Sequence, residues 1–335
     1  MKKVVLSVIA SIMIAVLALP FVGGWLMERA VRQAVNSVNA YYSDMGLGYS
    51  LTVTDYHRRY LTSDIEWKID LGPFKSFYDI EAIVLREHAK HGLTGVVSTT
   101  TLENNPWYAA FVANNLTGRD PLHITTRYGL LGGIESTVGI DPFSVSLENE
   151  TIDVKAANLS VNTDRTLESF TSSGKWQGLA VGDAMRIGET TLASTLMMIS
   201  PFVWEGDIGF ELTDVDVRDK NDALRLAKMK LHYLLDVDED RTESAMQTRL
   251  SIEGLASKGM AIDSASVRLG VNGVDLDAYE TFMHAYTQTM GRLLSGVTDF
   301  DSGGNAVKQQ MGMVGLQLMA AYENLLKKGL AFHIS

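Results

Sequence analysis

The period of hydrophobic and polar positions changes twice along the chain. Up to about residue 45, apolar residues recur at three- and four-residue steps, which predicts a helix. Apolar and polar residues then alternate over more than two hundred residues, which is typical of half-buried strands. The helical period returns from about residue 276. The fold class predicted is mainly β with α: a transmembrane anchor at 1–27, a juxtamembrane helix at 28–45, a long antiparallel β-sheet body at 46–275 and a C-terminal helical pair within 276–335.

The first predicted helix begins as a membrane anchor. Two lysines precede an uncharged run from Val4 to Met27, long enough to cross a bilayer core at 1.5 Å per residue. A cleaved signal peptide is the competing interpretation. The apolar stretch exceeds a usual signal core, and the best cleavage site would place Val22 and Gly24 at its critical positions. Trp25 lies at the depth of the membrane interface. We expect a retained, single-pass anchor with the bulk of the chain on the far side.

The alternation begins in the stretch "DYHRRYLTSDIEWKID", residues 55–70. Its apolar residues from Leu61 to Leu71 share one face, on which Ser63 is the only polar residue. Three basic residues, His57, Arg58 and Arg59, come directly before this strand. Solvated charges at a bend between two strands would protect the strand edges from mispairing. Contact with lipid headgroups is the alternative role for the same charges.

Similar alternating segments follow one another to about residue 275. In "LRLAKMKLHYLLDVD", Leu224 and Leu226 alternate, and the pattern resumes at Met229 after one extra residue. The segments "WQGLAVGDAMRIGETTL" and "IEGLASKGMAIDSASVRL" resemble each other, which suggests stacked hairpins or meanders. A sheet with one apolar face needs a cover, and another sheet, a helix or a ligand can supply it.

Two C-terminal helices are the predicted cover. Apolar residues recur at helical spacing from Asp277 to Leu294, and again from Met311 to Leu326 after the linker "DFDSGGN". Gly329 is the expected stop of the second helix. Methionine is dense on both helical faces, which suits a packed core and also suits an adaptable partner groove.

Composition narrows the function classes. The 335 residues are 46% hydrophobic and 21% charged, as expected of a folded protein, and carry a formal net charge of -11. Residues 1–100 hold 10 Lys and Arg against 9 Asp and Glu, whereas the remainder holds 19 against 31. This balance argues against a nucleic-acid partner. The absence of cysteine excludes disulfides, thiolate zinc sites and cysteine nucleophiles.

The sequence offers no residues for a catalytic site. It lacks the nucleophile-elbow, P-loop and dinucleotide-binding motifs. His88 and His91, with Glu87 beside them, would need a third ligand to hold a catalytic zinc, so we interpret both as structural. "DVDEDRTES" starts like an EF-hand loop, but Arg241 and Gln247 occupy its glycine and glutamate positions. An acidic hairpin tip is the better interpretation. We expect neither a cofactor nor an enzymatic activity.

The layout and two short motifs resemble the YdgA-like bacterial envelope proteins, a family of unknown function. Arg59 and Leu93 stand where that family usually has a glycine and a proline. The positions that match its motifs are Tyr56, Arg58, Leu61, Ser63, His91 and Gly92.

The resemblance implies a bacterial inner-membrane anchor and a β-rich periplasmic body, and it implies no catalytic residues. Family members add strands after the two helices. A more distant likeness to the AsmA-type β-grooves, which handle lipid, supplies a mechanism. We therefore expect a non-enzymatic structural or interaction protein of the envelope, or alternatively a lipid-binding or lipid-transfer β-groove. The partners expected are the bilayer, a second copy of the chain or a lipid ligand, and no nucleic acid.

Overall fold

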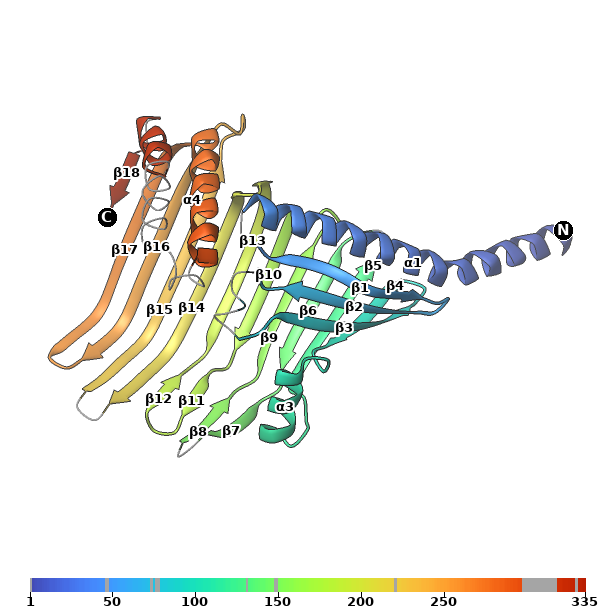
Figure 1. Cartoon of the computed structure of the whole chain (residues 1–335), viewed down its shortest axis with the longest axis horizontal. Helices are drawn as coiled ribbons and strands as arrows, with labels where there is room; N and C mark the ends of the chain where they lie inside the picture. Colours follow the sequence, from blue (N-terminus) through green and yellow to red (C-terminus); the bar gives the residue numbers. More distant parts are fainter. Residues whose placement is uncertain are drawn as a thin grey trace.

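One long antiparallel sheet dominates the molecule (Figure 1). The computed structural model describes the backbone of residues 2–45, 48–72, 75, 79–130, 132–147, 150–219, 222–296, 318–328 and 331–335. Side chains are described over the same ranges, except at 2–16, 147, 219, 222 and 290–296.

The described elements are three labelled helices, a further helical segment at 318–327, and eighteen strands. The labelled helices are α1 (Lys2–Asp44), α3 (Pro106–Asn115) and α4 (Leu276–Gly296). The strands are β1 (Ser50–Arg58), β2 (Thr62–Asp70), β3 (Ala82–His91), β4 (Gly95–Thr101), β5 (Leu122–Gly129), β6 (Ile134–Ile140), β7 (Phe143–Leu147), β8 (Glu150–Val154), β9 (Ala157–Thr163), β10 (Ser169–Trp176), β11 (Leu179–Val181), β12 (Met185–Ile187), β13 (Thr190–Ser200), β14 (Val203–Asp219), β15 (Asp222–Val237), β16 (Glu243–Ser257), β17 (Met260–Asp275) and β18 (Ala331–Ile334).

The sheet is a meander. Strands β1 to β6 pair in order, then β6 pairs with β9, β9 with β10, β10 with β13, and β13 to β18 again pair in order. The short strands β7, β8, β11 and β12 prolong β6, β9, β10 and β13 beyond a two-residue break. The two similar sequence segments form the β11–β12 and β16–β17 hairpins. The meander that they suggested is therefore confirmed.

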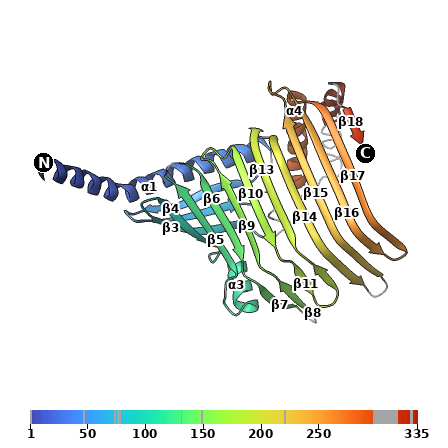
Figure 2. The ribbon, with the colours of Figure 1, turned by 180° about the vertical axis from the view of Figure 1, so that it is seen from behind.

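All these strands place their apolar residues on the same side. Directly paired residues share a face of a sheet. One row of partners crosses five strands through Leu192, Phe210, Leu231, Leu250 and Val267. We call the side that carries this row the apolar face. Figure 2 shows the opposite side, which neither α1 nor α4 crosses and where polar pairs such as Glu211 and Lys230 lie.

A crease crosses the sheet at one level of the eight long strands. It passes through the breaks at 141–142, 155–156, 177–178 and 188–189, and then through Asp214, Ala227, Gly254 and Asp263. Asp214 and Gly254 have left-handed φ values of 52° and 61°. Such residues interrupt the pleat, so the apolar positions resume one residue later. The extra residue before Met229 in the sequence lies on this crease.

Helices cover the apolar face in separate places. At one end, β1–β3 curl toward α1, and Met27 and Val31 of α1 pack against Ile65, Ala89 and Val96. At the other end, Leu276 of α4 packs with Val203 and Leu235. The contacts of α1 and α4 lie on one side of the crease, which we call above it. Below the crease, Val112 of α3 and the adjacent Leu116 pack on Val145 of β7. The side chains of Asn39 and the backbone of Leu51 exchange hydrogen bonds of 2.8 and 2.7 Å, which occupies part of the free edge of β1.

The predicted anchor and the juxtamembrane helix that continues from it form one α1, because Pro20 removes a single backbone hydrogen bond and the helix continues past it. Two other expectations about helices need correction. Helix α3 was not expected, although Pro106 after Asn105 is a good first helical residue. The C-terminal helical pair is present, but segment 276–335 ends in β18, which pairs with β17. The whole linker, the start of the second helix and its expected stop at Gly329 lie outside the described residues.

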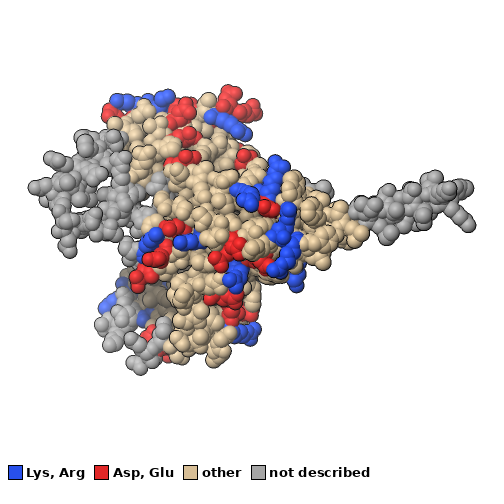
Figure 3. Space-filling model, turned by 45° about the vertical axis from the view of Figure 1, so that its right-hand side comes forward, with Lys and Arg blue, Asp and Glu red and all other residues tan. Residues whose placement is uncertain are grey.

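The predicted anchor falls mainly on residues 1–16, whose side chains lie outside the described residues. Within the described part of the chain, no helix is both long and apolar enough to cross a membrane. Figure 3 shows an uncharged surface where α1 leaves the body, with Lys and Arg side chains next to it.

We predict that Met27→Ala lowers the free energy of unfolding by about 2–5 kcal/mol, because it leaves a cavity where α1 meets the sheet. Met27 is 1% exposed, whereas Met319 in the second C-terminal helix is 69% exposed. Met319→Ala is the matched control, with an expected change below about 0.5 kcal/mol. Chemical denaturation of the full chain in a mild detergent measures both. Equal losses in the two variants would contradict this packing.

Candidate functional site

The motif residues gather where β1, β2 and β3 meet α1. Tyr56 and Arg58 pair with Ile65 and Ser63, and Ser63 pairs with Ala89, two residues before His91. Tyr56, Arg58, Ser63 and His91 therefore share the apolar face of three neighbouring strands. The other two motif positions lie apart: Leu61 is 55% exposed in the β1–β2 turn, and Gly92 donates its N–H to Gly95 in the β3–β4 turn at 2.8 Å.

His91 is held as a buried, neutral ring. It is 6% exposed, with Nδ1 3.2 Å from the carbonyl oxygen of Tyr60 and Nε2 2.9 Å from Oγ of Ser63. A carbonyl only accepts, so Nδ1 carries the proton and Nε2 accepts from the Ser63 hydroxyl. Burial lowers the pKa of His91, and the nearby charge of Arg58 lowers it further. A Cβ at Gly24 would lie 2.3 Å from the His91 ring, so only glycine allows α1 to approach this closely.

Arg58 joins the strands to α1 by charge. Its Nη1 lies 3.1 Å from Oε2 of Glu28, and its guanidinium lies 5.1 Å from the centre of the Phe21 ring. Both side chains of the ion pair are about one-quarter exposed. Ion pairs at such partly exposed sites contribute modestly. The contact fixes which turn of α1 faces β1.

The neighbouring charges face the other way. His57 lies 3.2 Å from Asp55, and Arg59 lies 3.6 Å from Asp64, all of them well exposed. His57 and Arg59 therefore occupy the solvated bend that the sequence predicted, whereas Arg58 does not. His88 also pairs with Asp64, at 2.6 Å, so it lies on the face opposite His91. The two histidines cannot share a ligand, and among the described residues no three His, Asp or Glu side chains converge.

Glu87, which the sequence placed only beside a possible metal-binding histidine pair, has a buried role that was not predicted. It is 3% exposed, and its carboxylate accepts from Trp67 Nε1 at 2.8 Å and from the Tyr128 hydroxyl at 3.0 Å. Burial and the Glu87 charge raise the pKa of Tyr128 well above its usual value. The available signal was its position, because Glu87 alternates with Leu85 and Ala89 on the apolar side of β3.

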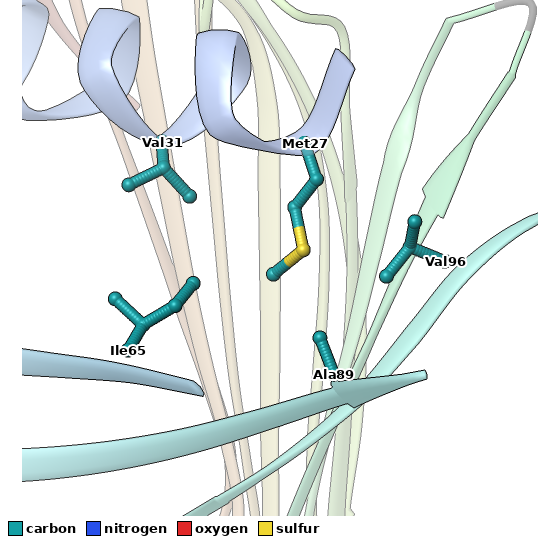
Figure 4. Packing of buried hydrophobic residues seen from close by; sticks show 5 residues of the cluster. All are labelled: Met27, Val31, Ile65, Ala89 and Val96. Atoms are coloured by element: carbon teal, nitrogen blue, oxygen red, sulfur yellow. The ribbon is translucent and has the colours of Figure 1, made fainter. Parts of the chain in front are cut away.

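The contacts of this cluster hold α1 against β1, β2 and β3. Its polar groups contact one another or Glu28 of α1. Beside them, the apolar residues in Figure 4 pack between α1 and the strands. A buried network with most partners supplied by the protein rigidifies a contact. We name the set of Glu28, Arg58, Ser63, Glu87 and His91 the α1 fastening.

The second candidate surface is the part of the apolar face that none of the described helices covers. Leu231 and Leu250 are 38% and 39% exposed, and Val267 and Leu269 are 43% and 45% exposed. From β6 to β17, above the crease, the described positions of this face carry no charged side chain. A hydrophobic surface of this extent is suited to an apolar ligand or partner.

We predict that the stability of the protein falls as the pH is lowered below about 6.5, the ordinary pKa of histidine. His91 keeps a lowered pKa while folded, so the unfolded chain binds more protons in this range and unfolding is favoured. In His91→Gln, thermal unfolding between pH 7 and pH 5 should depend less on pH. His232→Gln, on the exposed polar face, is the control that should keep the wild-type slope. Unchanged slopes in both variants would show that His91 is not buried as described.

A comparison with known protein families gives a match over the whole chain. The family described as "Bacterial protein of unknown function (DUF945)" matches residues 1–335. Comparisons with curated proteins and with solved structures gave no significant match. The expected membership of a bacterial family of unknown function is thus confirmed, while the YdgA-like and AsmA-type resemblances stay predictions. The chain belongs to the bacterial DUF945 family.

Proposed function

We propose that this protein is a membrane-anchored lipid-binding protein of the bacterial envelope, without enzymatic activity. The single observation that carries the proposal is the uncharged, partly uncovered apolar face of the sheet. The acyl chains of a lipid would lie against this face, and α1 would hold the protein at the inner membrane with the sheet in the periplasm.

The free energy of burying apolar side chains favours a ligand that needs no hydrogen-bonding partners on this face. A Leu or Val side chain left in water forfeits up to about 1.5–3 kcal/mol relative to full burial. A large exposed apolar area on a monomer generally marks an interaction site. Protein interfaces have polar rims that form about one hydrogen bond per 100–200 Å², whereas the row from Leu192 to Val267 offers side chains that form none. Acyl chains match such a surface.

The course of α1 supports delivery from a bilayer. The helix carries the uncharged run from Val4 to Met27, and its Met27 and Val31 pack on the apolar face. The segment that would lie in the membrane therefore continues directly onto the candidate lipid-binding surface. Phe21 and Gly24, which a cleavage near Trp25 would remove, contact Arg58 and His91 of the sheet. These contacts favour a retained helix.

Residues around the exit of α1 follow the order found at a membrane interface. Leu17, Phe21 and Val22 are exposed apolar residues, and the aromatic side chains of Trp25 and Tyr60 are 47% and 49% exposed beside them. The Tyr60 hydroxyl donates to the carbonyl of Leu17, which ties the β1–β2 turn to this level. Basic side chains come next (Figure 3). Apolar, aromatic and then basic residues mark the passage from lipid to water.

Self-association is the second candidate, and one observation favours it. Among the described strands, β18 pairs only with β17, and its Phe332 and Ile334 are 65% and 77% exposed. Exposed apolar edge strands tend to pair with other chains. A structural role through a second copy of the chain would use this edge rather than the uncovered part of the apolar face.

We predict that the full-length protein stays with the inner membrane when the periplasm is released by osmotic shock. The uncharged run is long enough to hold it there. Fractionation followed by N-terminal sequencing gives the result. Soluble protein beginning near Trp25 would disprove the anchor.

We predict that lipids crosslink to the apolar face and not to the polar face. Leu250 and Arg249 are adjacent but lie on opposite faces, and both are exposed. A photoreactive amino acid at position 250 of the membrane-embedded full chain should yield phospholipid adducts, and the same group at position 249 is the matched control. Equal adducts at both positions would contradict a lipid-binding face. Protein–protein crosslinks at position 250 without lipid would favour the self-association role.

A further inference from the structure

A cavity lies on the apolar face, between the end of α1 and the strands β10, β13 and β14. It has a volume of about 450 Å³ and opens where α1 ends beside the β9–β10 and β13–β14 turns. Phe170 pairs with Leu196, and Met198 pairs with Trp204, so its floor is part of the apolar face. Its most distinctive lining residues are Tyr41, Tyr42, Asp44, Glu168, Phe170 and Trp204.

The aromatic rings come from three elements and are held together. The Phe170 and Trp204 rings are 5.3 Å apart between centres at 57°, and the Tyr41 and Tyr42 rings are 6.0 Å apart at 56°. Tyr41 and Tyr42 belong to α1 and Trp204 to β14, so the cavity lies where the end of α1 meets the sheet. Burial raises the pKa of Tyr41, so its hydroxyl stays neutral at physiological pH. Four ring systems thus border one opening.

The charge of the cavity is acidic. Asp44 and Glu168 are exposed at its border, and no Lys or Arg is among its lining residues. Asp164 fixes the turn that carries Glu168, because it accepts from the Glu168 N–H at 2.9 Å and from the Ser169 hydroxyl at 3.0 Å. The Glu168 carbonyl in turn accepts from the N–H of Met198 at 2.7 Å. These hydrogen bonds hold the backbone of Glu168 in place, and with it the base of the side chain that carries the carboxylate.

We propose that this cavity binds an organic ammonium group. Aromatic rings attract a cation through their electron-rich faces, and aromatic cages are a known means of recognising alkylammonium ligands. The two carboxylates add attraction for a cation and would repel an anionic headgroup. Resting on the proposed lipid-binding function, this assigns the cavity as the headgroup site for an amine-bearing phospholipid whose acyl chains extend along the apolar face.

Headgroup selectivity is the direct test. The full chain is placed in nanodiscs that contain ethanolamine and glycerol phospholipids in equal amounts with identical acyl chains, and retained lipids are counted by native mass spectrometry. Wild-type protein should retain the ethanolamine lipid in about two- to fivefold excess, as one exposed cation–π contact provides. Asp44→Asn combined with Glu168→Gln should bring the ratio close to one. Glu135→Gln combined with Asp263→Asn removes the same charge from exposed sites outside the cavity and should leave the ratio unchanged.

A second arm separates a lipid headgroup from a free ammonium ligand. Choline is titrated onto the full chain in a nonionic detergent while tryptophan fluorescence is recorded. Saturable quenching that is lost in Trp204→Phe and in the carboxylate variant supports the ammonium site even if no lipid is retained. Saturable quenching that persists in both variants would place the choline elsewhere and overturn the inference.

Each remaining outcome also tests the ammonium site or the lipid-binding function. Lipid retention without headgroup preference, together with no choline response, overturns the ammonium site and leaves the lipid-binding function standing. Absence of both lipid and choline overturns the two proposals together. A preference for ethanolamine lipid that survives in the carboxylate variant places the selectivity outside this cavity and likewise overturns the inference.

Discussion

Every long strand of this protein puts its apolar side chains on the same face of one sheet, and removing that face from water is the constraint that shapes the molecule. A sheet whose two faces were both covered could be flat and layered. Here the cover is assembled from separate parts: α1 at one end, α4 at the other and α3 below the crease. Between α1 and α4, none of the described helices covers the apolar face, and its leucine and valine side chains are partly exposed.

The α1 fastening shows how polar chemistry serves this apolar contact. Methionine and valine contacts alone specify position loosely, because apolar packing is not directional. The ion pair of Arg58 with Glu28 and the fit of His91 against Gly24 define one register of the helix on the strands. Ser63 donates a hydrogen bond to His91, and the carboxylate of Glu87 accepts from Trp67 and Tyr128. A helix fixed in this way cannot shift along its axis without moving β1–β3.

The meander makes the sheet easy to build from local pieces. Nearly every strand pairs with the strand before and after it, so few contacts require long loops to close. The crease needs the same local irregularity in each of eight strands. Gly178, at a φ of 111°, would place a Cβ only 2.1 Å from the carbonyl oxygen of Ile187, and so it illustrates why glycine recurs at this level.

The sequence by itself determined the period of each segment, and hence the β-rich body, the helices at both ends and the hairpin turn at Asp238. It also placed Ser63 on the apolar side of its strand, because alternation follows from the pleat. Alternation cannot say which strands pair across the curl, so the meeting of Arg58 with Glu28, and of His91 with Gly24, was decided by the tertiary structure. The cavity lined by Tyr41, Phe170 and Trp204 has the same origin, because it joins elements more than a hundred residues apart whose distance only the folded sheet sets.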